Sequence, residues 1–197
     1  MSLYTNLINV SFDNSLKIMN DHVFYNTKVQ YFRIPSSVSN LNSQPFDQGH
    51  AMIWISVDPE NKYFCDVDCV LYSRDMTVLW FYPGDHGERF VNVPNTVHTI
   101  QLAAFSTSNI IQYINIPSSV KTIVGYQFIF MHAIEYIEIM NKNELINFDY
   151  AFILYDSHHN TSCIHFIPIP IITKNCPNFY YFSFFHSLTS YSVFIMM

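Results

Sequence analysis

The sequence predicts a solenoid in which short parallel strands line up along one side of stacked coils. Three observations favour this fold: a unit that recurs every 23 residues, one alternating apolar segment in each unit, and a proline where that segment ends. The 197-residue chain is 50% hydrophobic and only 12% charged, so it has enough apolar side chains to fold around a core. A single unit of this size cannot bury its apolar face, whereas stacked units can.

The repeat is clearest where two segments align without a gap. Residues Val93–Ile100 are VPNTVHTI and residues Ile116–Ile123 are IPSSVKTI, so the two prolines lie 23 residues apart. Counted from each proline, apolar residues recur three, six and eleven positions later, and we expect them to face the core. They are Val97, Ile100 and Phe105 in one unit, and Val120, Ile123 and Phe128 in the next.

The same spacing divides the chain into units. Unit starts fall near residues 13, 35, 58, 94 and 117, and the array ends near residue 140. The step from 58 to 94 is thirteen residues longer than the common step, which predicts a hairpin-like insertion within 58–93. Residues 1–12 are expected to lead into the array of 13–140, and residues 141–197 to hold degenerate repeats or a C-terminal cap.

Each unit is expected to contain a strand, a turn and a return segment. In Tyr113–Ile116 polar and apolar side chains alternate, so Ile114 and Ile116 share the face that is buried. Proline ends the strand because it cannot donate to a ladder, and the Ser-Ser or Asn-Thr pair that follows is typical of turns. The outward positions of the strands are then the surface that the solenoid presents.

The candidate binding surface is this outward face. An aromatic residue lies four positions before most unit starts, and a second residue lies two positions before them. The first row is Tyr31, Trp54, Phe90, Tyr113 and Tyr136, and the second is Arg33, Ser56, Asn92, Asn115 and Glu138. On strands about 4.8 Å apart the five rings would form one ladder roughly 19 Å long. The ladder could contact a ligand, or it could stabilise the sheet by about 0.2–1 kcal/mol per ring pair, and the insertion could cover it.

These segments resemble one known family, the BspA-type leucine-rich repeats of bacterial and protist surface proteins. The likeness rests on Ile116–Ile123, on Ala104-Phe105 in the unit before, and on the irregular unit, where Ile55–Phe64 (ISVDPENKYF) leads into Val70–Asp75 (VLYSRD). The resemblance implies a right-handed leucine-rich-repeat solenoid with short helical turns, and adhesion or protein binding at the cell surface without catalysis. The family usually has glycine before the VLY segment, where this chain has Cys69, so a distorted tight turn is expected there.

Two classes of function remain open. The first is a surface antigen or adhesin that binds a protein ligand through the strand face. The second is an intracellular scaffold or a decayed family member, because residues 1–15 show neither the basic segment nor the apolar run of a secretory signal. The uncharged stretch 179–197 contains six polar side chains, which favours a terminal cap or an incomplete repeat over a membrane span.

Other functions have little support in the sequence. Nine basic and fifteen acidic residues give a net charge of −6 without a basic patch, so no nucleic-acid partner is expected. Four glycines leave little material for phosphate loops, and no cofactor is predicted. No enzyme motif is present, and the nearest approach to an acid/base pair, Asp85-His86, lies in a Pro-Gly loop. Enzyme activity is therefore not expected.

Metal binding is not predicted either. The four cysteines, Cys65, Cys69, Cys163 and Cys176, do not have the spacing of zinc ligands. Acidic side chains crowd the insertion, where a solvated hairpin is the first interpretation and a cation site the alternative. They are Glu60, Asp66, Asp68, Asp75, Asp85 and Glu88.

Overall fold

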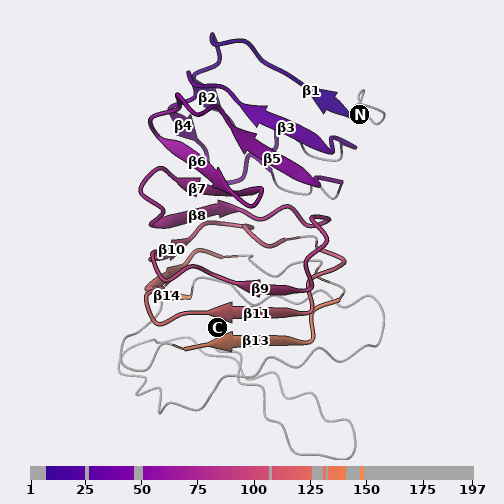
Figure 1. The fold of residues 1–197 in the computed structure, drawn as a ribbon, viewed down its shortest axis with the longest axis vertical. Helices are drawn as coiled ribbons and strands as arrows, with labels where there is room; N and C mark the ends of the chain where they lie inside the picture. Colours follow the sequence, from indigo (N-terminus) through magenta and orange to yellow (C-terminus); the bar gives the residue numbers. More distant parts are fainter. Residues whose placement is uncertain are drawn as a thin grey trace, which may run out of the picture.

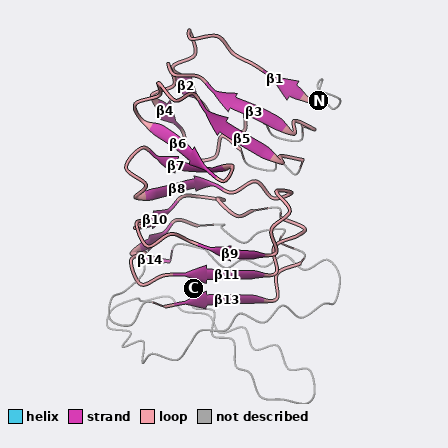
Figure 2. Cartoon of the chain, in the orientation of Figure 1, coloured by secondary structure: helices cyan, strands magenta, loops and turns pink. Residues whose placement is uncertain are grey.

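The chain winds into coils that stack along the long axis of the molecule (Figure 1). The structure, a computed structural model, describes residues 8–24, 27–46, 51–106, 108–125, 131, 133–140 and 147–148. Within these ranges the chain consists of strands joined by turns and loops, and no helix is assigned (Figure 2). The short helical turns implied by the family resemblance are therefore not found in the described part of the chain.

The strands of the described residues are short. They are β1 (Asn9–Val10), β2 (Ile18–Met19), β3 (Tyr31–Ile34), β4 (Asn40–Leu41), β5 (Trp54–Val57), β6 (Phe64–Val67), β7 (Val70–Ser73), β8 (Val78–Phe81), β9 (Phe90–Asn92), β10 (Thr99–Ile100), β11 (Tyr113–Ile116), β12 (Thr122–Ile123), β13 (Tyr136–Ile139) and β14 (Asn147–Phe148).

Parallel pairing confirms the 23-residue period. One side of the coils carries two three-stranded parallel sheets, β1-β3-β5 and β9-β11-β13. Residues 23 positions apart lie opposite each other, Tyr31 with Trp54 and Tyr113 with Tyr136. The other side carries a two-stranded sheet, β2-β4, and a six-stranded sheet in the order β14-β12-β10-β8-β7-β6.

The predicted core positions are confirmed where they are described. The +3, +6 and +11 residues Val97, Ile100 and Phe105 are fully buried, and so are Ile114 and Ile116 of β11, whose exposed fractions are 1% and below. Phe128, the +11 residue of the next unit, lies outside the described residues. Burial of this kind stabilises each large aliphatic side chain by about 1.5–3 kcal/mol, which is what holds one coil on the next.

The units that start at residues 35, 94 and 117 begin with a turn led by a proline. The amide of the +3 valine donates a hydrogen bond to the carbonyl oxygen of that proline, at 3.2 Å for Val38, 3.0 Å for Val97 and 3.1 Å for Val120. The bond spans four residues, as in a β-turn, and it reverses the chain from one side of the coil to the other. The predicted roles of proline and of the Ser-Ser or Asn-Thr pair are thus combined in one turn.

The insertion is a three-stranded meander that divides the core. Strand β6 pairs with β7 and β7 with β8, both antiparallel, and β8 then pairs in parallel with β10. Successive residues of β7 contribute to opposite sides: Val70 and Tyr72 belong to a core with the C-terminal units, and Leu71 to a core with the N-terminal units. In β8, Leu79 belongs to the core with the C-terminal units and Phe81 to the core with the N-terminal units. The solenoid therefore has two cores with the meander between them (Figure 1).

The turn between β6 and β7 is a regular two-residue hairpin loop. Val67 pairs with Val70, which leaves Asp68 and Cys69 as the loop, with φ angles of 47° and 64°. Two left-handed residues in succession are what a type I′ turn requires. The distortion expected from replacing glycine by Cys69 is therefore not found, because the cysteine itself takes the left-handed conformation.

Both ends of the array extend the sheets beyond the units counted in the sequence. The expected lead-in, residues 1–12, contains β1, in which Asn9 pairs with Tyr31. After residue 140, β14 pairs with β12. Cys163, Cys176 and the stretch 179–197, which were considered in the sequence, lie outside the described residues.

Candidate functional site

The candidate site consists of the outward residues of the two three-stranded sheets, β1-β3-β5 and β9-β11-β13. These residues face away from the cores, as predicted. Burial alternates along β3 and β5, so that Phe32, Ile34 and Ile55 are buried while their neighbours are not. The exposed fractions are 46% for Tyr31, 50% for Trp54 and 63% for Phe90. Because these rings remain accessible, the meander does not cover them.

The aromatic row is split into two parts. Tyr31 and Trp54 lie in the sheet β1-β3-β5, whereas Phe90, Tyr113 and Tyr136 lie in β9-β11-β13, and β5 does not pair with β9. The single ladder of five rings was wrong, because the meander occupies the space that one more coil would fill. We call the outward side of β1, β3 and β5 the N-terminal face, and that of β9, β11 and β13 the C-terminal face.

On the C-terminal face the aromatic side chains pack against each other. The rings of Phe90 and Tyr113 are stacked, with centroids 4.8 Å apart and planes at 7°. The Tyr113 hydroxyl donates to Oε2 of Glu135 at 3.0 Å, and Gln112 Nε2 donates to Oε1 of the same carboxylate at 3.0 Å. The hydrogen bond to Glu135 raises the pKa of Tyr113. A stacked ring with an anchored hydroxyl fits a sheet-stabilising role for this pair.

The polar row of the C-terminal face is also paired within the sheet. Asn115 Nδ2 donates to Oδ1 of Asn92 at 3.3 Å, across β11 and β9. Asn115 lies opposite Glu138 of β13 in the register. The side chain of Tyr136, the last of the predicted aromatic residues, lies outside the described atoms. The contact shown within this row is thus the one between Asn92 and Asn115 along the solenoid axis.

The N-terminal face differs, because its two aromatic side chains do not stack. Tyr31 and Trp54 lie opposite each other in the register, yet no ring contact joins them among the described residues. Instead both line a hollow of about 310 Å³ that spans the three strands. Its lining is Asn9, Val10, Ser11, Tyr31, Phe32, Arg33, Trp54 and Ser56.

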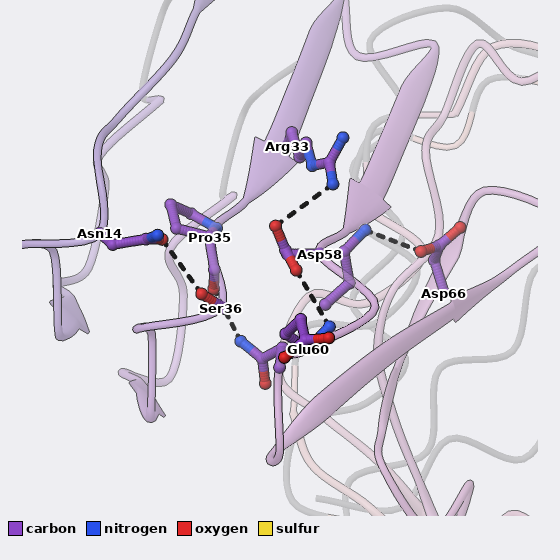
Figure 3. Close-up of polar contacts among 9 residues, drawn as sticks. Asn14, Arg33, Pro35, Ser36, Asp58, Glu60 and Asp66 are labelled. Carbon is purple, nitrogen blue, oxygen red and sulfur yellow. Dashed lines mark hydrogen bonds and ion pairs between the residues drawn. The ribbon is translucent and has the colours of Figure 1, made fainter.

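Arg33 at the hollow is held by an acidic side chain that is itself fixed. Its guanidinium contacts Oδ2 of Asp58 at 3.2 Å, and Oδ1 of Asp58 accepts the backbone N–H of Glu60 at 3.0 Å (Figure 3). The Arg33 side chain is 62% exposed and that of Asp58 25%, so solvent screens the pair and its contribution to stability is small. What the pair does is to orient the guanidinium and to balance its charge.

Two acidic residues of the insertion accept hydrogen bonds from backbone N–H groups. Asp66 accepts the N–H of Val57 at 2.7 Å, which satisfies a donor on the edge of β5 (Figure 3). Asp75 accepts bonds from Ser73 and Thr77, and these lower its pKa to about 2. No group of three potential metal ligands occurs in the described ranges, and the alternative of a cation site gains no support.

Two features were missed in the sequence, one in the site and one in the core. Asn9 and Ser11 were assigned to a lead-in, although Asn9 lies four positions before the unit start at residue 13, which is the position of the aromatic row. Asn61 takes the +3 position of the third unit, where the units starting at 35, 94 and 117 have valine, and is 1% exposed. The first could have been found from the spacing alone, whereas the second is a polar residue in a position that otherwise predicts core.

A family model matches most of the chain. The model of the BspA type leucine rich repeat region matches residues 2–62 and 88–193, with six copies. The interruption contains the meander of β6, β7 and β8. Among curated proteins no relative of the chain is found. In the described part of the chain, no helix is both long enough and apolar enough to cross a membrane.

Solved structures show the same fold. A leucine rich cell surface protein from Faecalibacterium prausnitzii is similar with a TM-score of 0.64 at 24% identity, over 70% of this chain and 36% of that one. A leucine-rich repeat protein from Eubacterium ventriosum gives 0.57 at 21% identity, over 65% and 41%. The pneumococcal vaccine antigen PcpA gives 0.53 at 16% identity, over 64% and 42%. The matched part is thus less than half the length of each of these proteins.

Proposed function

Because this chain belongs to the BspA-type leucine-rich repeat family, we propose that it is a non-catalytic binding module that holds a protein ligand against the outward face of its strands. The observation that carries the proposal is the accessibility of Tyr31 and Trp54 on neighbouring strands of one rigid sheet. Tryptophan and tyrosine are enriched among the residues that dominate binding energy, because they provide a large contact area with few rotatable bonds. In the described part of the chain, neither ring stacks on another aromatic side chain.

The role of the module is that of a surface antigen or adhesin. In support, one of the similar structures is a cell surface protein and another is a vaccine antigen. Antibody labelling of an epitope-tagged chain on intact and on permeabilised source cells tests this role. Labelling of intact cells is expected, and labelling only after permeabilisation would contradict a surface role while leaving the binding module itself in place.

Site-specific crosslinking tests which face binds the ligand. A photo-crosslinking residue replaces Trp54 in one variant and Ile18 in another, and both variants are exposed to the same cell surfaces. Ile18 lies in β2 of the other sheet and is 51% exposed, which makes it a close match to Trp54 at 50%. A crosslinked product specific to position 54 is expected. Equal products from both positions would refute the assignment of the strand face.

The contribution of the aromatic side chains is then measured on the captured ligand. Replacing Tyr31 and Trp54 together by serine is expected to weaken its affinity at least tenfold, because each is accessible enough to act as an anchor. The Ile18→Ser variant is the control and should bind as the unmodified chain does. If the double variant keeps full affinity, the ligand contacts another surface.

A further inference from the structure

We propose that the hollow of the N-terminal face binds an uncharged pyranose ring, either of a free saccharide or of a glycan carried by a protein partner. The inference rests on the proposed function in that it uses the same face, and it adds the chemical class that this face recognises. Three observations support it: the ring faces, the polar lining and the balance of charge.

The aromatic rings of the hollow are available for stacking. On the C-terminal face, Phe90 and Tyr113 already cover each other at a centroid distance of 4.8 Å. Tyr31 and Trp54 make no such contact among the described residues, and both line the hollow. A pyranose has a face of C–H groups that packs on an aromatic ring, so two unstacked rings on adjacent strands offer walls for it.

The rest of the lining is mixed: it is largely apolar, and it includes three residues whose side chains both donate and accept hydrogen bonds. Asn9 contributes an amide, and Ser11 and Ser56 contribute hydroxyls. A purely apolar guest, such as a leucine or proline side chain, would remove water from these groups without replacing its hydrogen bonds, at a cost for each group left unpaired. A sugar has hydroxyls around the edge of its ring and an apolar face, which matches a lining with both properties.

Charge balance favours an uncharged guest. The hollow has one cationic lining residue, Arg33, and its guanidinium is paired with Asp58 at 3.2 Å. The remaining N–H groups of Arg33 can still donate to a hydroxyl, because a guanidinium has five. A carboxylate on the guest would instead be repelled by Asp58, and an ammonium group would be repelled by Arg33. The volume of about 310 Å³ is at the small end of the range for ligand pockets, about 300–1,000 Å³, which favours a small guest.

The first test uses ligand-observed NMR with the unmodified full chain and a panel of small probes. The panel holds methyl glycosides of glucose, galactose, mannose and N-acetylglucosamine, and it adds glucuronic acid, glucosamine, cyclohexanol and N-acetylproline amide as comparisons. Because Asn9-Val10-Ser11 is an acceptor sequence for N-glycosylation, the protein is produced in bacterial cells. Saturation transfer to at least one methyl glycoside is expected, with a dissociation constant of about 1–10 mM for so small a ligand.

Matched variants locate the bound ring. Tyr31→Ser removes one wall of the hollow, and Phe90→Ser removes an exposed aromatic side chain from the other sheet, outside the hollow. The first is expected to weaken glycoside binding by about tenfold or more, and the second to leave it within about twofold. A second readout is the fluorescence of Trp54 in a Trp80→Phe background, which removes the only other tryptophan. Glycoside binding should shift that emission.

Each contrary result overturns the inference in a distinct way. Absence of binding by every glycoside at about 100 mM, far above the expected millimolar range, would refute it. Equal or stronger binding of cyclohexanol or N-acetylproline amide would identify an apolar or peptide guest, and stronger binding of glucuronic acid or glucosamine a charged one. Equal losses in Tyr31→Ser and Phe90→Ser would place the ring elsewhere.

One further experiment distinguishes a glycan carried by the partner from a free saccharide. It also distinguishes failure of this inference from failure of the proposed protein-binding function. The protein captured by crosslinking at position 54 is measured before and after enzymatic removal of its glycans. Loss of affinity after deglycosylation indicates a glycan carried by the partner. If methyl glycosides bind and the deglycosylated partner keeps its affinity, the hollow recognises a free saccharide. If the partner binds through the face but no glycoside does, the proposed function stands and the inference fails.

Discussion

The Asn61 side chain should be among the largest single contributors to the stability of the N-terminal half. It is 1% exposed and makes four hydrogen bonds to backbone groups. Nδ2 donates to the carbonyl oxygens of Pro35 at 2.8 Å and Val38 at 2.9 Å. Oδ1 accepts the N–H groups of Tyr63 at 2.8 Å and Phe64 at 2.9 Å. The amide thus connects the preceding coil to the start of the meander.

The cost of Asn61→Ala follows from these four bonds. A net contribution of about 1 kcal/mol for each gives roughly 4 kcal/mol, and the four backbone groups would be left without partners in a buried site. If water entered the vacated space, the loss would fall to about 2 kcal/mol. Either value is a large part of the 5–15 kcal/mol that is typical of a whole domain. We therefore expect a clear shift of the unfolding midpoint.

Urea unfolding followed by tryptophan fluorescence measures the effect. Both tryptophans, Trp54 and Trp80, lie in β5 and β8 and so report on this half of the chain. Asn95→Ala is the control, since Asn95 is exposed in the corresponding proline-led turn of a later unit. Its expected effect is below about 0.5 kcal/mol.

A second substitution separates hydrogen bonding from simple core filling. The same +3 position holds Val38, Val97 and Val120 in other units, all fully buried. If the position required only an apolar side chain, Asn61→Val would stabilise the chain. The structure predicts that Asn61→Val destabilises it, although less than alanine does, because the valine methyl groups recover part of the packing. Stability equal to or above that of the unmodified chain would refute the assigned role of Asn61.

Three further predictions concern other contacts. Ser108→Ala should cost about 1–2 kcal/mol in urea unfolding, because the buried hydroxyl donates to Gly84 O at 2.8 Å; an effect no larger than that of the exposed control Ser118→Ala would contradict this. The pKa of Asp75 is lowered from 3.8 to about 2, so its stabilising effect is complete above about pH 4 and is lost as the pH falls toward 2. Thermal melts at pH 2–5 should therefore show a weaker pH dependence for Asp75→Asn than for the unmodified chain, and identical slopes would argue against the assignment. Replacing Asp68-Cys69 by Asn-Gly should raise the free energy of unfolding by about 1 kcal/mol, and with it the urea midpoint, because both residues have left-handed φ angles. A lowered midpoint would show that the buried thiol of Cys69 contributes more than the relief of backbone strain.

The parts of the fold that could be predicted from the sequence are those that repeat. Val97, Ile100 and Phe105 were placed in the core because the same residue types recur at the same offsets, and the alternation of β11 placed its isoleucines inward. These features depend on period alone, and every unit is an independent observation of them. The alternation also placed Tyr31 and Trp54 outward for the same reason.

What could not be predicted depends on contacts that occur once. Whether β5 pairs with β9 is decided by where the thirteen additional residues go, and their period-2 pattern does not say whether a meander lies beside the coil or across it. Whether two aligned rings stack depends on their side-chain rotamers, which the register does not determine. Phe90 stacks on Tyr113, whereas Tyr31 and Trp54 line the hollow without stacking on each other. The polar Asn61 could not be placed in a core position, because its partners are backbone atoms that the fold brings together.

Because the meander separates the two stacks of coils, the sequence of one stack can change without a change in the other. Its strand β7 sends alternate side chains into two separate cores, so the coils before it and the coils after it share no ladder on the outward side. Gain or loss of a 23-residue unit in one stack would leave the register of the other unchanged. The two faces can therefore diverge at different rates: substitutions that retune the hollow beside Trp54 need no compensating change beside Phe90. One chain thus carries two outward faces that selection can alter separately.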